Sequence, residues 1–254
     1  MTLFSLQNRV AFITGGNGGI GLGMAKGFAS CGAAVVIAGR NEEKAQLALS
    51  ELHSLGARAE FLELDVLTET SCHEAIERAV ERFGRLDILV NNAGTSVRKV
   101  PEDLTAHDWH LVMNTNLTSA FLCSQAAYPH MRSAGGGKII NIGSMMSIFG
   151  MPFATAYAAS KGGLVQMTRA MATAWAKDGI QVNAILPGWV DTDLTRGARQ
   201  EVPGLHEKVL ARTPAQRWGV PNDFAGVAVF LGSPASNFMT GVAIPVDGGY
   251  SIQG

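Results

Sequence analysis

The sequence lacks the features that would commit it to a membrane or to a polyanion. Lysine and arginine total 20 against 21 acidic residues, so the formal net charge of -1 provides no basic field for nucleic acid or an anionic membrane surface. No stretch approaches the roughly 20 apolar residues that cross a bilayer, and the opening MTLFSLQNRVAF has no basic segment before a long apolar run. We therefore expect an unprocessed, cytoplasmic protein that binds neither nucleic acid nor membrane.

Cysteine and metal-ligand patterns are equally sparse. Cys31, Cys72 and Cys123 are odd in number and lack CxxC or Cys/His spacing, so we expect reduced thiols without a chemical role. The six histidines form no HExxH motif, and Asp191 and Asp193 have no evident partners in the sequence. We expect no catalytic metal.

The sequence does contain short β-branched or apolar runs that alternate with longer segments of helical period. This alternation predicts a Rossmann-type doubly wound parallel sheet with helices on both faces, and ligands at the carboxyl ends of its strands. Without a linker or repeat, we expect one dinucleotide-binding domain over residues 1–254. The predicted strands are VAFIT, AVVIAG, AEFLEL, LDILVN, KIINIG, IQVNAIL and AIPVDG, and the predicted helices include 41–55, 69–83, 108–131 and 155–178.

One late segment departs from this alternation. Residues 192–215, TDLTRGARQEVPGLHEKVLARTPA, are more polar and only weakly periodic. Such segments near strand ends are typical of covers over binding sites, so we expect a flexible substrate flap at about 192–212 rather than a second domain.

A glycine cluster follows the first predicted strand in VAFITGGNGGIGLGMAKGFA. A backbone without Cβ atoms can approach a pyrophosphate that lies on the N-terminus of the following helix. The position between a first strand and a helix favours dinucleotide binding over a simple tight turn. The residues expected at the cofactor in this loop are Gly15, Asn17, Gly19, Ile20 and Gly21.

A tyrosine and a lysine lie one turn apart in ATAYAASKGGL, within the predicted helix 155–178. A phenol is a poor acid or base near neutrality, but an adjacent ammonium stabilises the phenolate, so we expect Lys161 to lower the pKa of Tyr157. Tyr157 then becomes usable as a general acid and base. Ser144, at the end of KIINIGS, can direct its hydroxyl to the same carbonyl oxygen, with Ser147 as the alternative.

The order of these motifs resembles that of the short-chain dehydrogenase/reductase family in its single-domain form. The resemblance is carried by TGGNGGIG at 14–21, NNAG at 91–94, Ser144, YAASK at 157–161 and PG at 187–188. NNAGTSVRK, MNTNLTSAFLCSQAA and RTPAQRWGVPND are similar to its gluconate 5-dehydrogenase and 2-deoxygluconate 3-dehydrogenase branch, and the 3-oxoacyl carrier-protein reductase branch is similar too. The resemblance implies reversible hydride transfer between a nicotinamide and a ketone or secondary alcohol.

The resemblance also implies roles for individual residues. Ser144 would orient the substrate, Tyr157 would carry the proton, and Lys161 would also bond the nicotinamide ribose. Asn116 matches an asparagine that holds a water linking Lys161 to solvent, with Asn114 as the alternative. Further cofactor positions are Asp65 and Val66 at the adenine, Asn91, Ala93 and Gly94 along the adenosine half, and Pro187, Gly188, Val190 and Thr192 at the nicotinamide.

The end of the second strand bears on the choice of nicotinamide. An acidic residue there receives the ribose hydroxyls of NAD, whereas an arginine can meet the additional phosphate of NADP. Arg40 follows Gly39 at this point, and a guanidinium can form a bidentate contact with phosphate. We favour NADP; Glu42 and Glu43, which could pair with Arg40 or reach a ribose, keep NAD as an alternative.

Positions after the strand ends predict the substrate pocket, formed by Ser96, Ser144, Met145, Met151, Tyr157 and Trp189. Methionine and tryptophan favour an apolar or flexible substituent, whereas Arg98 and Lys99 could hold a carboxylate. We expect a ketone or secondary alcohol, with a sugar acid or polyol as the leading candidate. The alternatives are a 3-oxoacyl thioester reductase and a non-catalytic cofactor sensor.

Two predicted helices carry broad apolar faces. Segment 155–178 places Leu164, Met167, Met171 and Trp175 on one stripe, and 108–131 carries a second apolar face. These faces look wider than packing on one sheet requires, so we expect pairing through a two-fold axis. The resemblance implies a homotetramer built from such dimers.

Overall fold

The structure, a computed structural model, describes residues 3–253 and is built around one parallel sheet. Its seven strands run in the order β3-β2-β1-β4-β5-β6-β7, and every neighbouring pair is parallel. This confirms the predicted Rossmann-type doubly wound sheet. The strands are β1 (Val10–Thr14), β2 (Ala34–Gly39), β3 (Ala59–Glu63), β4 (Ile88–Asn91), β5 (Gly137–Ile142), β6 (Ile180–Pro187) and β7 (Ala243–Val246).

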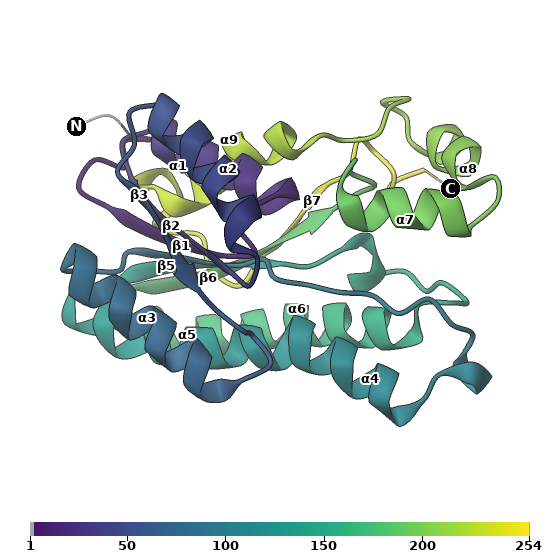
Figure 1. Ribbon diagram of the computed structural model, residues 1–254, viewed down its shortest axis with the longest axis horizontal. Coiled ribbons are helices and arrows are strands. Elements are labelled where there is room, and N and C mark those ends of the chain that lie inside the picture. The colour runs from purple at the N-terminus through teal and green to yellow at the C-terminus, as the bar shows by residue number, and fades with distance from the viewer. Residues whose placement is uncertain (1–2, 254) are drawn as a thin grey trace.

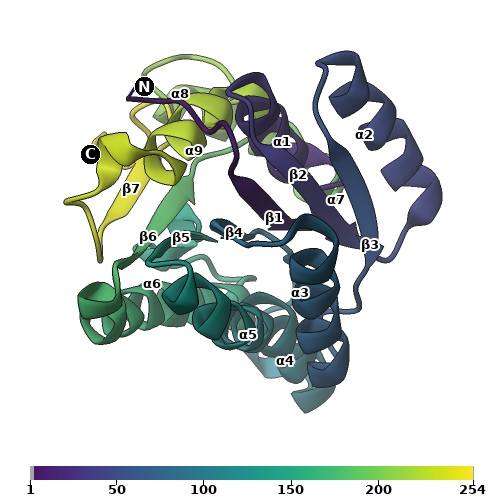
Figure 2. The same ribbon diagram turned by 90° about the vertical axis from the view of Figure 1, so that its left-hand side faces the viewer.

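Helices cover both faces of the sheet, as Figures 1 and 2 show. One layer contains α1 (Gly19–Ser30), α2 (Glu42–Ser54) and α9 (Ala225–Gly232). The other contains α3 (Glu69–Phe83), α4 (Ala106–Met113), α5 (Ser119–Ser133) and α6 (Thr155–Trp175). Two further helices, α7 (Asp193–Glu201) and α8 (Leu205–Arg212), lie beyond the end of the sheet (Figure 1).

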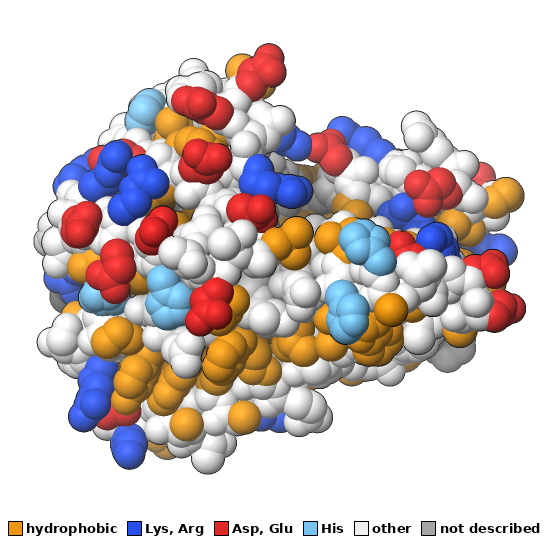
Figure 3. Space-filling view, turned by 60° about the horizontal axis from the view of Figure 1, so that its bottom comes forward, with side chains coloured by type: hydrophobic (Ala, Val, Ile, Leu, Met, Phe, Trp, Pro, Cys, Tyr) orange, Lys and Arg blue, Asp and Glu red, His pale blue; other side chains and the backbone are white. Residues whose placement is uncertain are grey.

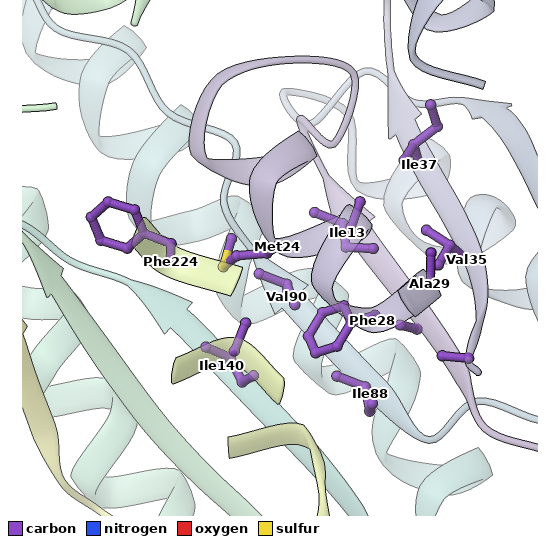
Figure 4. Packing of buried hydrophobic residues seen from close by; sticks show 14 of the residues in the cluster. Ile13, Met24, Phe28, Ala29, Val35, Ile37, Ile88, Val90, Ile140 and Phe224 are labelled. Atoms are coloured by element: carbon purple, nitrogen blue, oxygen red, sulfur yellow. The ribbon is translucent and has the colours of Figure 1, made fainter. Parts of the chain in front are cut away.

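Each face of the sheet has its own hydrophobic core. All five residues of β1 are buried, because a central parallel strand packs against helices on both sides. Ile13 belongs to the cluster under α1, where Figure 4 shows it near Phe28, whereas Phe12 belongs to the cluster under α3 and α5. The alternation of side chains along the strand thus divides one apolar run between two cores.

The crevice for a ligand is set by the strand order. β1 pairs with β2 on one side and with β4 on the other, so the chain connections diverge at this point. In open α/β sheets such a switch point leaves a crevice at the carboxyl ends of the strands. The glycine loop after β1 and the NNAG segment after β4 both lie there.

The predicted helix 108–131 is helical throughout but not α-helical throughout. α4 ends at Met113, and a π-helical turn over Asn114–Thr118 precedes α5. The predicted helix 155–178 ends as an α-helix at Trp175 and continues as a 3₁₀ turn over Ala176–Asp178. Both departures are local changes in hydrogen-bond spacing that apolar periodicity does not reveal.

The segment predicted as a flap folds into α7 and α8. Ala198, Leu205 and Val209 pack with Trp218 in a small buried cluster of their own. The two helices have only nine and eight residues, which explains the weak periodicity of their sequence. Their role as a flexible cover stays a prediction.

The apolar stripe of α6 is largely used inside the chain, which corrects the expectation of a wide free face. Leu164 and Met171 are buried, and Trp175 stacks on Tyr128 of α5 with ring centroids 4.9 Å apart. Figure 3 nevertheless shows hydrophobic side chains gathered over this layer, and Phe121 of α5 is 43% exposed. The oligomeric state stays a prediction.

The buried cysteines are in contact with each other. Cys72 of α3 and Cys123 of α5 lie in the same core, and both are free thiols. The hydrogen bond to Cys72, together with burial, raises the pKa of Cys123 well above its usual value. Cys31 is partly exposed. No helix within residues 3–253 is long and apolar enough to cross a bilayer.

Candidate active site

The glycine loop forms a cradle that Cβ atoms would fill. Gly19 has φ +52°, in the left-handed region that favours glycine, and a Cβ on Gly21 would lie 2.5 Å from the Gly15 carbonyl oxygen. Gly18, which has no side chain to cap α1, leaves the first N–H groups of this helix for a ligand. The loop therefore fits the phosphates of a dinucleotide.

A cavity of about 300 Å³ lies beside this loop. It reaches the start of α6 and the segment after β6, so it joins three parts of the chain that are distant in the sequence. Most of the predicted cofactor residues line it: Gly15, Asn17, Gly19, Ile20, Gly94, Tyr157, Lys161, Pro187, Gly188, Val190 and Thr192. Gly21 lies behind it, where α1 packs against the loop.

Besides Gly21, five predicted cofactor residues lie outside that lining. Arg40 is exposed at the end of β2, and the Asp65 carboxylate accepts a hydrogen bond from the Leu67 N–H at 3.1 Å. The Asn91 side chain points into the core, where its Nδ2 donates to Asn141 Oδ1 at 2.8 Å, and so it joins β4 to β5. Val66 and Ala93 are partly buried.

Asn92, which the sequence reading missed, connects the two strands at the switch point. Its Nδ2 donates to the carbonyl oxygens of Thr14 and Gly15, both at 3.0 Å. The Thr14 hydroxyl in turn accepts the N–H groups of Asn92 and Ala93, each at 2.9 Å. The doubled asparagine of NNAG was the available signal: the first lies in the strand core, and the second reaches the site.

Ser144, Tyr157 and Lys161 meet at the end of β5. Ser144 and Tyr157 line both the cofactor cavity and an adjoining hollow, so their hydroxyls lie between the two. Lys161 Nζ donates to the Ile142 carbonyl at 2.7 Å and lies 5.7 Å from the centroid of the Tyr157 ring. Ser147, the alternative to Ser144, donates to the Lys161 carbonyl at 2.8 Å and so braces the loop against α6.

Burial shifts the pKa values of Tyr157 and Lys161 in opposite directions. Burial raises the pKa of Tyr157, while a hydrogen bond with Ser144 and the positive charge of Arg98 oppose the rise. Burial lowers the pKa of Lys161 to about 8. The expected lowering of the Tyr157 pKa by Lys161 is therefore wrong for this geometry, because the ammonium bonds the Ile142 carbonyl rather than the phenol. Tyr157 is a neutral phenol at pH 7.

The π-helical turn directs Asn116 inward. Its Oδ1 accepts the Thr95 N–H at 2.8 Å, and its Nδ2 donates to Ser160 Oγ and to the Thr95 carbonyl, both at 3.0 Å. Asn114, the alternative, is exposed and accepts from the Thr118 hydroxyl. The turn thus ties the segment after β4 to α6, next to Lys161.

The adjoining hollow contains all six predicted substrate residues: Ser96, Ser144, Met145, Met151, Tyr157 and Trp189. Arg98 also lines it, and donates to Glu201 Oε2 at 2.8 Å and to the Leu194 carbonyl at 2.7 Å, both on α7. Lys99 instead pairs with Asp108 of α4 at 2.7 Å. The two neighbouring cations therefore have different surroundings.

Asp191 and Asp193 have partners, contrary to the expectation from the sequence. Asp191 accepts hydrogen bonds from Arg196 and Arg199, and Asp193 pairs with Lys44 of α2 and with Arg196. The fold of α7 brings these arginines back over the aspartates, which a weakly periodic sequence did not reveal. Within residues 3–253, no three His, Cys, Asp or Glu side chains gather in a way that could hold a metal ion.

The doubly wound sheet, with a serine, a tyrosine and a lysine beside its glycine loop, defines a Rossmann-fold oxidoreductase. Residues 15–251 match the sequence profile described as enoyl-(acyl carrier protein) reductase. The chain belongs to the short-chain dehydrogenase/reductase family and is an oxidoreductase that acts on CH–OH groups.

Its relatives include several sugar-acid dehydrogenases. The chain is 43% identical to 2-dehydro-3-deoxy-D-gluconate 5-dehydrogenase of Escherichia coli, over 98% of each chain. It is 38% identical to gluconate 5-dehydrogenase of Gluconobacter oxydans, over 99% of this chain and 98% of the relative. Gluconate 5-dehydrogenase from Burkholderia cenocepacia, solved in complex with NADP and tartrate, is 40% identical, with a TM-score of 0.94 over 99% of this chain and 98% of that one.

Proposed function

We propose that this chain transfers hydride reversibly between NADP and a sugar acid, at a keto or secondary hydroxyl carbon. The observation that carries the proposal is Arg98, whose guanidinium lines the same hollow as Ser144 and Tyr157. A cation there can bind a carboxylate while the hydroxyls meet the reacting oxygen. The relatives support this choice, since one is named 5-keto-D-gluconate 5-reductase and another was solved with NADP and tartrate.

The residues of the site divide the chemistry between them. A bound nicotinamide supplies or accepts the hydride. Tyr157 gives a proton to the substrate oxygen in reduction, for which its neutral phenol is the competent form, and takes it back in oxidation. Ser144 orients that oxygen, Lys161 holds the ribose, and Asn116 fixes the segment beside Lys161.

Glu201 of α7 takes the position of a substrate carboxylate at Arg98. The two side chains form an ion pair at 2.8 Å at the rim of the hollow. The Glu201 side chain is 56% exposed, so water screens its attraction to Arg98 and a substrate carboxylate can displace it. Arg98 thereby becomes the selective contact for an acidic substrate.

The test compares Arg98→Ala with Lys99→Ala. Arg98→Ala should raise KM for 5-keto-D-gluconate about 10- to 100-fold and leave KM for a neutral ketone nearly unchanged, because it removes a charge-assisted contact remote from the reacting carbon. Lys99→Ala is the matched control, since Lys99 pairs with Asp108 away from the hollow. Equal effects of Arg98→Ala on both substrates, or no turnover of any sugar acid, would contradict the proposal.

The preference for NADP over NAD is part of the same proposal. Arg40 is exposed beside the glycine loop, where a Cβ on Gly39 would lie 3.5 Å from Asn17 Nδ2. Arg40→Asp should weaken NADPH far more than NADH, because it replaces an attraction to the 2′-phosphate with a repulsion. Equal affinities of the parent protein for the two cofactors would refute the preference.

A second candidate is reduction of a 3-oxoacyl thioester. The apolar side chains of Met145, Met151, Phe153 and Trp189 in the hollow favour it, because they can pack against an acyl chain. Turnover of an acetoacetyl thioester above that of 5-keto-D-gluconate would place this candidate first, and failure to oxidise NADPH with any ketone would favour a non-catalytic cofactor sensor.

We also propose that the chain forms one domain with α7 and α8 as its substrate cover, and works in the cytoplasm as a homotetramer. The exposure of Phe121 on α5 supports assembly through this layer. A monomer in sedimentation at micromolar concentration would contradict it.

A further inference from the structure

Lys44 lies over the glycine loop although it belongs to α2. A Cβ on Gly18 would lie 3.0 Å from Lys44 Cε and 3.2 Å from its Nζ. The side chain lines the same cavity as Gly19 and Ile20. The structure thus places an ammonium group at the phosphate cradle, from a position that the glycine motif does not include.

This ammonium is paired across the cavity with Asp193, the first residue of α7. Lys44 Nζ and Asp193 Oδ2 are 2.5 Å apart, and the ion pair connects α2 to α7 over the cavity. The side chains are 45% and 69% exposed, so water screens their attraction. A ligand that attracts the ammonium more strongly than Asp193 does can therefore separate them.

A phosphate bound at the glycine loop would be such a ligand. It would attract Lys44 and repel Asp193, so the phosphate and the carboxylate compete for the same ammonium. Asp193 does not lose every partner in that exchange, because Arg196 NH1 lies 3.4 Å from its Oδ1. The exchange therefore leaves both charges of the original pair with counter-charges.

We propose that Lys44 is a phosphate-binding residue of the cofactor site and that Asp193 holds its ammonium until the cofactor arrives. The inference rests on the proposed function, in which a dinucleotide occupies the glycine loop. Cofactor binding then breaks the pair and releases the N-terminus of α7, which lines the substrate hollow through Leu194, Thr195 and Ala198. The substrate wall thereby responds to the cofactor.

The cofactor offers two phosphate sources near Lys44. The glycine loop is the expected place of the pyrophosphate, whereas Arg40 and the hydrogen bond from Asn17 Nδ2 to the Asn41 carbonyl, at 3.2 Å, lie toward the end of β2, where a 2′-phosphate is expected. A substrate carboxylate is a poorer fit, because Arg98 rather than Lys44 lines the substrate hollow.

The test uses two variants that break the same ion pair from opposite sides. Lys44→Met and Asp193→Asn are compared by fluorescence titration with NADPH and with NADH. Lys44→Met should weaken binding about tenfold, since it removes a charge-assisted contact. Asp193→Asn should tighten binding roughly two- to fivefold, since it removes the competitor.

Opposite signs separate phosphate binding from a purely structural role. If the pair only positions α7, both variants should change affinity in the same direction, and that result overturns the proposal, as does an unchanged affinity in Lys44→Met. Hydrogen exchange over residues 193–201 should rise in both variants, and in the parent protein on addition of NADPH; an unchanged exchange on that addition also counts against the proposal.

The controls keep failure of folding and failure of the proposed function apart. Lys26→Met removes a lysine, 35% exposed, that pairs with Glu51 between α1 and α2, and it should leave cofactor affinity unchanged. Weakening of NADPH alone in Lys44→Met assigns the contact to the 2′-phosphate, and weakening of both cofactors assigns it to the pyrophosphate. A parent protein that binds neither nucleotide would refute the proposed function itself; normal parent binding with unaffected variants refutes only the role of Lys44.

Discussion

A buried lysine lies at each end of strand β5, and the two lysines have similarly lowered pKa values but different surroundings. Lys138, near its start, donates to Asn237 Oδ1 at 3.0 Å and to Ser236 Oγ at 3.3 Å. Lys161 of α6 donates to the carbonyl of Ile142, the last residue of the strand. Burial lowers the pKa of each to about 8. A perturbed pKa therefore does not by itself identify a catalytic residue.

The difference between the two ends comes from the direction of the chain. Helices return antiparallel to the strands, so the C-termini of α5 and α9 lie near Lys138, beside the hollow formed by Ala134, Gly135 and Ser233. Cations stabilise helix C-termini, which gives Lys138 a structural role. Lys161 lies at the opposite edge, where the glycine loop and Tyr157 provide a site for chemistry.

The largest expected effect on activity comes from changing Tyr157, the phenol that lies beside Lys161 and has no counterpart beside Lys138. Tyr157→Phe keeps the ring but removes the hydroxyl proton, so kcat should fall about 100- to 10,000-fold while NADPH affinity stays nearly intact. Steady-state kinetics and fluorescence titration measure the two quantities. A variant that retained most of its rate would show that another group carries the proton.

Replacing each of the two lysines by alanine should sharpen the contrast between the two ends of the strand. Lys161→Ala should lower kcat/KM on the order of 100-fold and also weaken NADPH, because this side chain is assigned to both the proton carrier and the ribose. Lys138→Ala should leave kcat/KM of the folded enzyme within about threefold, since Lys138 lies four residues before Ile142, roughly 13 Å away along the strand. Similar losses in both variants would remove the distinction between the two ends.

Stability should change in the opposite sense to activity. A pKa lowered from 10.5 to about 8 corresponds to about 3 kcal/mol of unfavourable burial for Lys161 at pH 7. Lys161→Met should therefore raise the free energy of unfolding by about 1–2 kcal/mol after loss of the bond to Ile142. Lys138→Met should give no such gain, because it leaves two side-chain acceptors without their donor. Denaturant unfolding at pH 7 measures both, and a less stable Lys161→Met protein would contradict the burial argument.

The smallest expected effect is the pH dependence of that stability. Below about pH 8 folded and unfolded chains both hold the lysine protons, so the contribution is constant. Between about pH 8 and the unfolded pKa of about 10.4 the unfolded chain binds more protons, so stability rises with pH. From pH 7 to 9 the rise should be about 1 kcal/mol larger in the parent protein than in Lys161→Met. Parallel curves for the two proteins would contradict the lowered pKa.

The sequence predicted those parts of the site that lie in local motifs. The glycine loop, Ser144, Tyr157 and Lys161 each follow a strand or share a helix face, so short-range pattern was sufficient to find them. Lys44 and Asp193 are 149 residues apart and meet only because α7 folds over the glycine loop. Such contacts depend on tertiary packing, which no local pattern records. The raised pKa of Tyr157 escaped prediction for the same reason, since burial depends on the whole fold.

The π-helical turn at Asn114–Thr118 limits how this region can change in evolution or in the laboratory. A π turn contains one residue more than an α turn, so deleting a single residue there would restore a regular helix. Because the wider turn absorbs the extra residue, the helices on either side would keep their buried faces after the deletion, but Asn116 would lose the turn that directs it toward Thr95 and Ser160. The extra residue at 114–118 should therefore be kept, and chimaeras should be joined outside the segment 106–133.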